Sequence, residues 1–415
     1  MKRRDLLLKS SLMGAGLLVL PRISFANSPM GFAKNFVMIQ VQDGWDVTLS
    51  LDPKTHKDHN TKQEDIFIEY SEDQIAHKAG DIRLAPAAAP IAEFSNEMSV
   101  VNGVILAPFD VGHSGCLSYI TTGNSEGKAP VLPIEFANLL GQSPLGVITN
   151  EAISPLNRPV LITASTNVAS IVEDGNSLNL KAPRRGAFTG SFQRLMQMSN
   201  RLEAAKTQFE KLGFDSQKRR ESGNVGKLLA SVFSAGLSNS ALLDVSADLD
   251  THSNHPGTHL QNQTKAWEEI ANIFKTFRSV ETTNGRNLFD DTLFMVVSEF
   301  ARTPALNTSK GKDHNPLTNS VLFAGGLVRG GQSLGHSHVI TAENSTTGSS
   351  QHTALPIHIE TLQAARTSQV ARDDKYIYIT PEVIAATAGS ILRLNPADVK
   401  SVDMNKTFIL SSLLK

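Results

Sequence analysis

The stretch from residue 293 to residue 314 constrains the fold more than any other part of this sequence. It opens with the apolar run Leu293–Val297, which is typical of a buried strand. Glu299 and Arg302 follow, and charged groups are costly at the end of a buried strand unless they are paired or functional. In open α/β sheets, ligands bind at this end of the strands. The stretch therefore predicts a strand that leads into a functional site; the alternative is a strand followed by a solvated salt bridge and a turn.

Two clusters of Asp and His follow predicted strands. Asp313 and His314 close the stretch described above. Residues 248–259, which come after another apolar run, hold two Asp and three His, including Asp250 and His252. Carboxylate oxygens and imidazole nitrogens suit zinc and similar ions. The pattern predicts a metal centre assembled from the ends of neighbouring strands.

The first buried strand is expected at residues 35–42. It ends in Asp43 and Asp46, which flank Gly44 and Trp45. These carboxylates are candidate metal ligands, and an Asx turn is the alternative. The polar residues 51–85 that follow are expected to form a surface excursion with solvated histidines.

A helix is expected to begin at His113 and Ser114, after a strand at residues 98–104, and to end near Gly123. The free N–H groups and the dipole at a helix N-terminus favour anions and lower the cost of an alkoxide. Ser114 is therefore a candidate nucleophile, and a structural N-cap is the alternative. The single cysteine, Cys116, excludes an intramolecular disulfide and is expected to be a small buried side chain.

Residues 1–26 have the pattern of an export signal. A charged region with adjacent Arg3 and Arg4 precedes a short apolar segment and small residues that favour cleavage after Ala26. The paired arginines resemble the twin-arginine export signal; a plain secretory signal or an uncleaved anchor is the alternative. We expect a periplasmic or extracellular protein with no stable membrane span after cleavage, because the apolar segment is short.

Residues 27–415 are expected to form a single α/β domain. Strands alternate with helical segments along the chain, which predicts a mostly parallel sheet. Residues 186–237 are largely helical in pattern and are expected to be a helical insertion or cap. The formal net charge of −1 gives no indication of a nucleic-acid partner, and the sequence identifies no protein partner.

The motifs in this order resemble the DUF1501 family, within the alkaline phosphatase-like superfamily. The resemblance runs nearly end to end and rests on the segments Asp43–Asp46, His113–Gly123, Asp250–His252, Ser298–Pro304 and Gly311–His314. It implies an alkaline phosphatase-like fold in three layers, with a mostly parallel central sheet flanked by helices. It also implies an exported metal-dependent hydrolase that acts on phosphate or sulfate esters, either small molecules or polymers.

The resemblance further implies two divalent metal ions, which would be zinc, manganese or calcium. One ion would be held by Asp43 or Asp46 with Asp313 and His314, and the other by Asp250 and His252. The implied catalytic residues are Ser114, His113, Arg302 and Glu299. In these roles Arg302 would bind a substrate oxygen, and Glu299 would hold Arg302 or a water molecule.

Two departures from the family pattern leave alternatives open. Gly112 stands where relatives often have Ser, so either Ser114 or a water is the nucleophile. The sequence after Cys116 lacks the Pro and Arg of sulfatases, which excludes a formylglycine. A late metal ligand is expected among His336, His338, His352 and His358. The alternative functions are a non-catalytic binding or envelope-assembly protein and a metal-dependent hydrolase of another class, such as an amidase.

Overall fold

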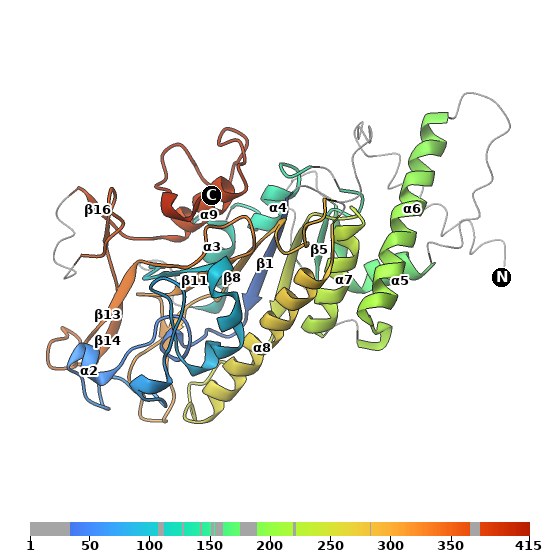
Figure 1. The fold of residues 1–415 in the computed structure, drawn as a ribbon. Coiled ribbons are helices and arrows are strands. Elements are labelled where there is room, and N and C mark those ends of the chain that lie inside the picture. Colours follow the sequence, from blue (N-terminus) through green and yellow to red (C-terminus); the bar gives the residue numbers. More distant parts are fainter. Residues whose placement is uncertain are drawn as a thin grey trace.

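The computed structural model describes residues 34–106, 112–126, 128–141, 143–150, 153, 161–174, 189–218, 221–282, 284–365 and 374–415, and the expected signal at residues 1–26 lies outside them. Its centre is an eight-stranded sheet (Figure 1). The strands run in the spatial order β12 (Gln332–Leu334), β4 (Met98–Asn102), β11 (Ser320–Ala324), β8 (Thr292–Val297), β1 (Asn35–Val41), β7 (Ser240–Val245), β5 (Val147–Thr149) and β6 (Ile162–Ala164). Neighbouring strands are parallel except that β11 runs antiparallel to β4 and β8.

β1 lies in the middle of the sheet between β8 and β7. Its Met38 pairs in register with Leu242 on one side and Met295 on the other. All of β1 is buried, and alternate residues belong to different cores: Met38 to one and Val37 to the other. Because both faces of the sheet are covered, its parallel strands are continuously apolar, which is why the strand predictions at residues 35–42 and 293–297 are confirmed.

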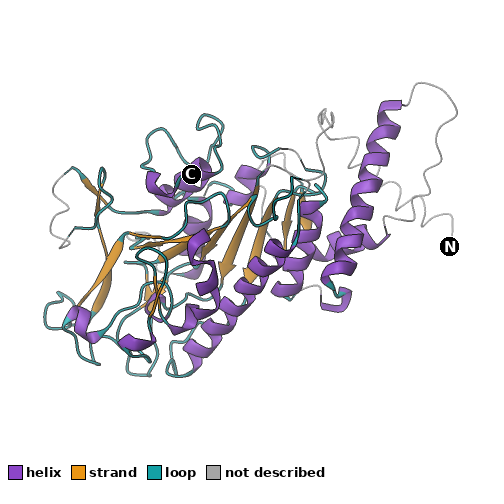
Figure 2. Ribbon diagram, viewed as in Figure 1, coloured by secondary structure: helices purple, strands orange, loops and turns teal. Residues whose placement is uncertain are grey.

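Helices cover both faces of the sheet (Figures 1 and 2). One face carries α3 (His113–Thr122), α4 (Leu132–Ala137) and α9 (Pro381–Ile391). The other carries α7 (Ser222–Ser234), α8 (Thr258–Ser279) and the 3-10 helix η3 (Pro86–Glu97). The predicted class, an α/β fold with a mostly parallel central sheet flanked by helices, is confirmed.

The segment 186–237 is largely helical where the structure describes it. α5 (Ser165–Asp174) and α6 (Thr189–Leu212) lie toward the β6 edge of the sheet, and α6 packs against α7. α7 buries Val225, Leu229 and Phe233 in the same core as Val37 of β1. The structure therefore places α7 within the helical layer that covers the sheet.

Short paired strands lie outside the central sheet. They are β9 (Ala301–Arg302) with β10 (His314–Asn315), β13 (His336–Ile340) with β14 (Gln351–Leu355), β15 (Ile357–His358) with β16 (Tyr376–Ile377), and β2 (Ala76–His77) with β3 (Arg83–Leu84). The remaining helices are α2 (His56–His59) and the 3-10 helices η1 (Val47–Leu49), η2 (Glu72–Gln74), η5 (Ser216–Lys218) and η7 (Ser411–Leu413).

The expectation that residues 51–85 form a surface excursion is wrong for residues 51–55 and 65–70, whereas His77 is exposed as expected. Ile66 and Tyr70 are buried, and so is the ion pair of Asp52 with Lys54, at 2.7 Å. Ser337 donates a hydrogen bond to the Asp52 carboxylate. Charged residues are tolerated in a core when they are paired and hydrogen-bonded, and a composition-based prediction does not detect such pairing.

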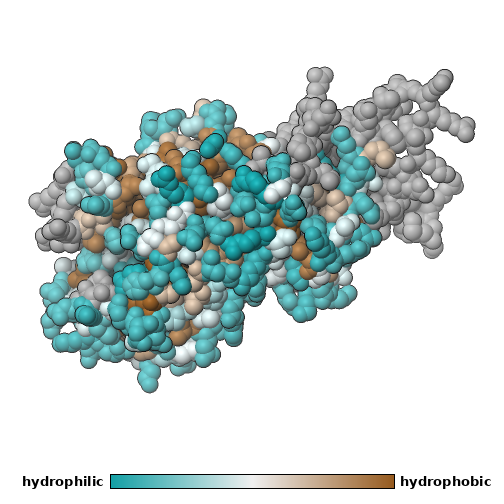
Figure 3. All heavy atoms as spheres, in the orientation of Figure 1, coloured by the Kyte–Doolittle hydropathy of each residue, from teal (hydrophilic) through white to brown (hydrophobic). Residues whose placement is uncertain are grey.

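The surface drawn in Figure 3 is mainly hydrophilic, with smaller hydrophobic areas between. Among the described residues, the exposed large hydrophobic side chains are Leu161, Met196 and Ile359, which lie in separate parts of the chain. Within the described ranges, none of the helices has the length and apolar character that a membrane span requires.

Candidate metal centre

The site forms where three parallel strands end side by side. β8, β1 and β7 are neighbours in the sheet, so the residues that follow them meet at one edge. Asp43 follows β1, Asp250 follows β7 and Glu299 follows β8. His113 reaches the same place as the first residue of α3, and the described geometry confirms that it lies at a helix N-terminus.

His314 is brought in by the short β9–β10 hairpin, in which it pairs with Arg302. Further along the hairpin loop, Gly311 lies against the backbone of His252. A Cβ atom at position 311 would lie 1.9 Å from the carbonyl carbon of His252, so only glycine permits this approach. The two predicted Asp/His clusters are thereby held together.

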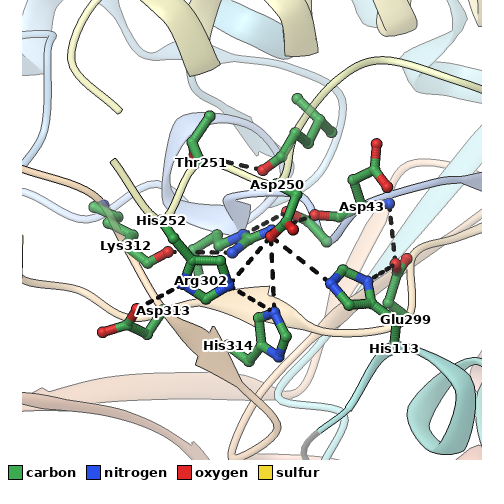
Figure 4. Close-up of polar contacts among 12 residues, drawn as sticks. Asp43, His113, Asp250, Thr251, His252, Glu299, Arg302, Lys312, Asp313 and His314 are labelled. Carbon is green, nitrogen blue, oxygen red and sulfur yellow. Dashed lines mark hydrogen bonds and ion pairs between the residues drawn. The ribbon is translucent and has the colours of Figure 1, made fainter. Parts of the chain in front are cut away.

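Three imidazole nitrogens surround one carboxylate oxygen (Figure 4). The distances from Asp250 Oδ1 to the Nε2 atoms are 3.3 Å for His252, 3.7 Å for His113 and 3.8 Å for His314. The Nε2 atoms of His252 and His314 are 3.0 Å apart. Zinc bound tetrahedrally at about 2.0–2.1 Å places its ligand atoms roughly 3.4 Å from one another. The spacing of His113, Asp250 and His314 therefore fits a metal ion, and His252 lies beside His314 as a further nitrogen donor.

Two further carboxylates orient these imidazoles through their Nδ1 atoms. His252 Nδ1 is 2.7 Å from Asp313 Oδ1, and His113 Nδ1 is 2.8 Å from Glu299 Oε1. If each Nδ1–H donates to its carboxylate, each Nε2 presents a lone pair toward Asp250. Such carboxylate–histidine pairs are the usual support of a metal-binding histidine. Asp313, predicted from the sequence to be a ligand, here contacts His252 instead.

The donor set also limits which metal fits. Three nitrogens with one oxygen suit zinc or manganese better than calcium, which prefers oxygen ligands. Four carboxylates gather here, those of Asp43, Asp250, Glu299 and Asp313, against the single guanidinium of Arg302. A divalent cation would offset this excess of negative charge. Asp250 and His252 are each 46% exposed, so the site opens to solvent.

Arg302 is fully buried, and its guanidinium donates hydrogen bonds to other groups of the protein. It donates to the carbonyl oxygens of Gly44 at 3.0 Å and Lys312 at 3.1 Å, and also to that of Asp43. It donates to Asp250 Oδ1 at 2.8 Å. Burial would raise the pKa of Asp250, but the hydrogen bond and charge of Arg302 outweigh it and lower that pKa. Arg302 thus ties three loops together, and its geometry differs from the expected contact with substrate.

Phe300 packs against two histidines of the site, and it was not among the site residues predicted from the sequence. Its buried ring stacks on His314, with centroids 4.1 Å apart, and lies 4.9 Å from the ring of His113. Gly44 has φ of +71°, and a Cβ there would lie 2.2 Å from the Phe300 ring. The position of Phe300 directly after the strand-end Glu299 is the sequence signal that could have identified it.

Asp43, His113 and Glu299 form a second, overlapping group of possible ligands. Burial and the negative charges of Glu299 and Asp250 raise the pKa of Asp43. A neutral imidazole carries one N–H, so His113 cannot bind a metal through Nε2 while Nδ1 also acts as a ligand. Because Nδ1 faces Glu299, the group around Asp250 is the better-supported metal site.

Asp46 lies apart from both groups of possible ligands. It is fully buried, its carboxylate is 2.6 Å from Lys312 Nζ, and it accepts a hydrogen bond from the Thr48 N–H. Burial would raise its pKa, but the Lys312 charge outweighs that effect and holds the pKa well below its usual range. Asp46 therefore forms the turn that was the alternative to metal binding. Asp43, in contrast, faces the group of possible metal ligands.

The other expected site residues are placed as follows. Ser114 is exposed in the first turn of α3, next to His113, and Cys116 is buried as predicted. His336, His338, His352 and His358 belong to none of the ligand groups found among the described residues. His352 is instead buried beside Ser337, and the further histidine of the site is His113.

Replacing Asp313 with asparagine is expected to weaken metal binding about 10- to 100-fold, the usual cost of losing a partner that orients a histidine. The asparagine keeps the shape of the side chain but removes the charge that accepts from His252 Nδ1. Competition titration with a chromogenic chelator measures the affinity. Glu126→Gln, at an exposed carboxylate, is the matched control. Complete loss of metal in Asp313→Asn would instead support the direct ligation expected from the sequence.

Comparison with known proteins gives one family match. The family model described as "Protein of unknown function (DUF1501)" matches residues 172–382, just over half of the chain. That range contains Asp250, His252, Glu299, Asp313 and His314, whereas Asp43 and His113 precede it. No curated protein matches the sequence.

Among solved structures, the chain is similar to the lipoteichoic acid synthase LtaP from Listeria monocytogenes, with 9% identity, a TM-score of 0.40, and coverage of 93% of this chain and 79% of that chain. It is similar to the C-terminal periplasmic domain of EcEptC from Escherichia coli, with 12% identity, a TM-score of 0.36, and coverage of 94% and 91%. A 2-O GAG sulfatase matches with 7% identity, a TM-score of 0.34, and coverage of 87% and 71%. These likenesses are remote, and the candidate site is defined by the side chains of this chain.

Proposed function

The chain belongs to the DUF1501 family of proteins of unknown function, and we propose that it is an exported, metal-dependent hydrolase of phosphate or sulfate esters. The observation that carries the proposal is the convergence of three imidazole nitrogens on the Asp250 carboxylate, with Asp313 and Glu299 orienting two of the rings. We assign His113, Asp250, His252 and His314 to a metal ion, with zinc or manganese as the fitting elements. Export rests on the signal-like residues 1–26 alone.

The ester specificity rests on charge. A divalent cation bound here would polarise a phosphoryl or sulfuryl oxygen and stabilise the charge that develops on it. The N-terminus of α3, which carries His113, adds free N–H groups that favour an anion. Arg302 contributes by holding the loops that carry Asp43 and Asp250, rather than by touching the ester.

Ser114 is our candidate for the attacking group. Its hydroxyl is exposed in the first turn of α3, one residue after His113. A water molecule is the other candidate for the attacking group. Ser114→Ala distinguishes the two, because it removes the hydroxyl while leaving every proposed metal ligand in place.

Purified protein loaded with zinc or manganese is expected to release phosphate or sulfate from a panel of simple esters, and to stop doing so after chelation. Turnover restored by adding metal back would link the activity to the site. Ser114→Ala should lose activity about 100-fold or more if the serine attacks, with unchanged metal content. Cleavage of amides in preference to every ester on the panel would contradict the proposal.

A non-catalytic binding protein is the second candidate, and one observation favours it. Arg302, the guanidinium that the described part of the chain places in the cluster, is buried and donates to backbone carbonyls. A protein that holds metal stoichiometrically but turns over no ester or amide would support this alternative. It would then be tested as a metal-dependent binder of anionic polymers.

A further inference from the structure

A buried polar network lies next to the proposed metal centre, on the interior side of Asp250 and His252. It is built on Thr251, which stands between the proposed ligands Asp250 and His252 in the sequence. Thr251 is buried, whereas Asp250 and His252 on either side of it are partly exposed. The hydroxyl of Thr251 lies 2.8 Å from His255 Nδ1 and 2.8 Å from His259 Nδ1.

The two histidines around Thr251 are structural residues of the interior. Both are fully buried, and their rings stack with centroids 4.3 Å apart. Burial lowers the pKa of each, and for His259 the neighbouring His255 adds to that effect. Both rings are therefore neutral at neutral pH, and each carries one N–H and one lone pair.

Gln263 and the backbone of Asp46 fix the His259 ring from its other side. Gln263 Nε2 donates to the Asp46 carbonyl at 2.9 Å, and Gln263 Oε1 accepts from the Asp46 N–H at 2.9 Å. His259 Nε2 lies 2.9 Å from the same Oε1 and 3.0 Å from the Asp46 nitrogen. The ring is thus held between Thr251 at Nδ1 and the Gln263–Asp46 pair at Nε2.

Asp46 also contacts the second ring. His255 Nε2 lies 3.4 Å from Asp46 Oδ2, so Asp46 approaches one imidazole with its carboxylate and the other with its backbone N–H. The Thr251 hydroxyl has one hydrogen, and its neighbours are the two Nδ1 atoms and the Leu249 carbonyl at 3.4 Å. The hydroxyl is therefore surrounded by polar groups of the interior.

Backbone contacts fix Thr251 as well. Its carbonyl accepts from the Lys312 N–H at 3.0 Å, and its own N–H donates to the Leu249 carbonyl at 2.8 Å. Asp248 and Asn254, on either side of this segment, have positive φ values of 49° and 53°. A non-glycine residue rarely adopts such a backbone, so the segment needs fixed contacts to hold its shape.

We propose that Thr251 is a positioning residue: its hydroxyl, held between two buried imidazoles, fixes the backbone from which Asp250 and His252 project toward the metal. This inference rests on the proposed metal centre. Partly exposed ligands bind weakly unless their support limits their freedom. The network supplies that support from the interior, and no group in it has to contact the metal.

The test compares Thr251→Val, which removes the hydroxyl at nearly constant shape, with Thr251→Ser, which keeps it. Thr251→Val is expected to lower the affinity of the full protein for zinc or manganese about 10- to 100-fold. Thr251→Ser is expected to keep the affinity of the wild type. Thermal unfolding of the metal-free proteins separates this effect from a loss of stability. Equal affinity in Thr251→Val and wild type, or an equal loss in both variants, would overturn the inference.

A second measurement uses the wild-type protein, so it tests the inference even if Thr251→Val does not fold. Nitrogen NMR of the metal-free wild type is expected to report both rings neutral at neutral pH, with both Nδ1 atoms engaged in hydrogen bonds. A charged ring, or an Nδ1 atom outside any hydrogen bond, would overturn the inference. A wild type that binds no metal would overturn the proposed function and this inference with it, whereas wild-type binding that Thr251→Val leaves unchanged would overturn the inference alone.

Discussion

Replacing His314 with alanine is expected to reduce the metal content of the protein from about one equivalent to less than about a tenth of one. His314 supplies one of three imidazoles around Asp250, and its Nε2 lies 3.0 Å from that of His252. Its loss leaves the remaining ligands in a solvent-open site, where water competes for the metal. Mass spectrometry of protein purified without chelators measures the content directly.

His77→Ala is the matched control, because His77 is exposed in β2 and lies outside the described ligand groups. Its metal content should equal that of the wild type. A His314→Ala protein that keeps its full metal content would refute the site. About two equivalents in the wild type would match the two ions predicted from the sequence and would make the overlapping group of Asp43, His113 and Glu299 the candidate for the second ion.

Replacing Arg302 with alanine is expected to lower the free energy of unfolding by about 2–6 kcal/mol, because each of two buried carbonyls left without a donor costs about 1–3 kcal/mol. The lost pair with Asp250 adds less, since that carboxylate is 46% exposed. The carbonyls of Gly44 and Lys312 would lose a buried donor, and an unsatisfied buried acceptor is itself destabilising. Metal affinity should fall as well, because Asp250 loses the guanidinium that holds it. Urea unfolding of the metal-free protein measures the first effect.

Arg302→Lys is expected to recover only part of the loss, since an ammonium group cannot reproduce the planar fork that reaches three loops. Arg83→Ala is the matched control: its pair with Glu72 is partly exposed on both sides, and such pairs contribute less than about 1 kcal/mol. Unchanged unfolding of Arg302→Ala would mean that the hydrogen bonds of this guanidinium do not hold the loops.

The sequence predicts the sheet and the general location of the site well. Strands such as β1 and β8 are covered on both faces, so their apolar runs are continuous and easy to recognise. The polar residues that follow them must meet at one edge because β8, β1 and β7 are parallel neighbours. Asp250, His252 and His314 were therefore predictable as members of one cluster.

The role of each residue was decided by tertiary structure alone. Asp43 and Asp46 are three positions apart after the same strand, yet Asp43 faces the cluster while Asp46 is buried against Lys312. Asp313 contacts an imidazole, and Arg302 is buried instead of facing a ligand.

What the sequence by itself determined is the set of chemical groups that reach the end of the sheet, because strand pattern and residue order decide which side chains arrive there. What only the tertiary structure decided is which group faces the metal, which supports it and which stabilises the interior. Those choices depend on pairings between residues far apart in the chain, such as His113 with Glu299 and Asp46 with Lys312. Local sequence patterns carry no record of such pairings.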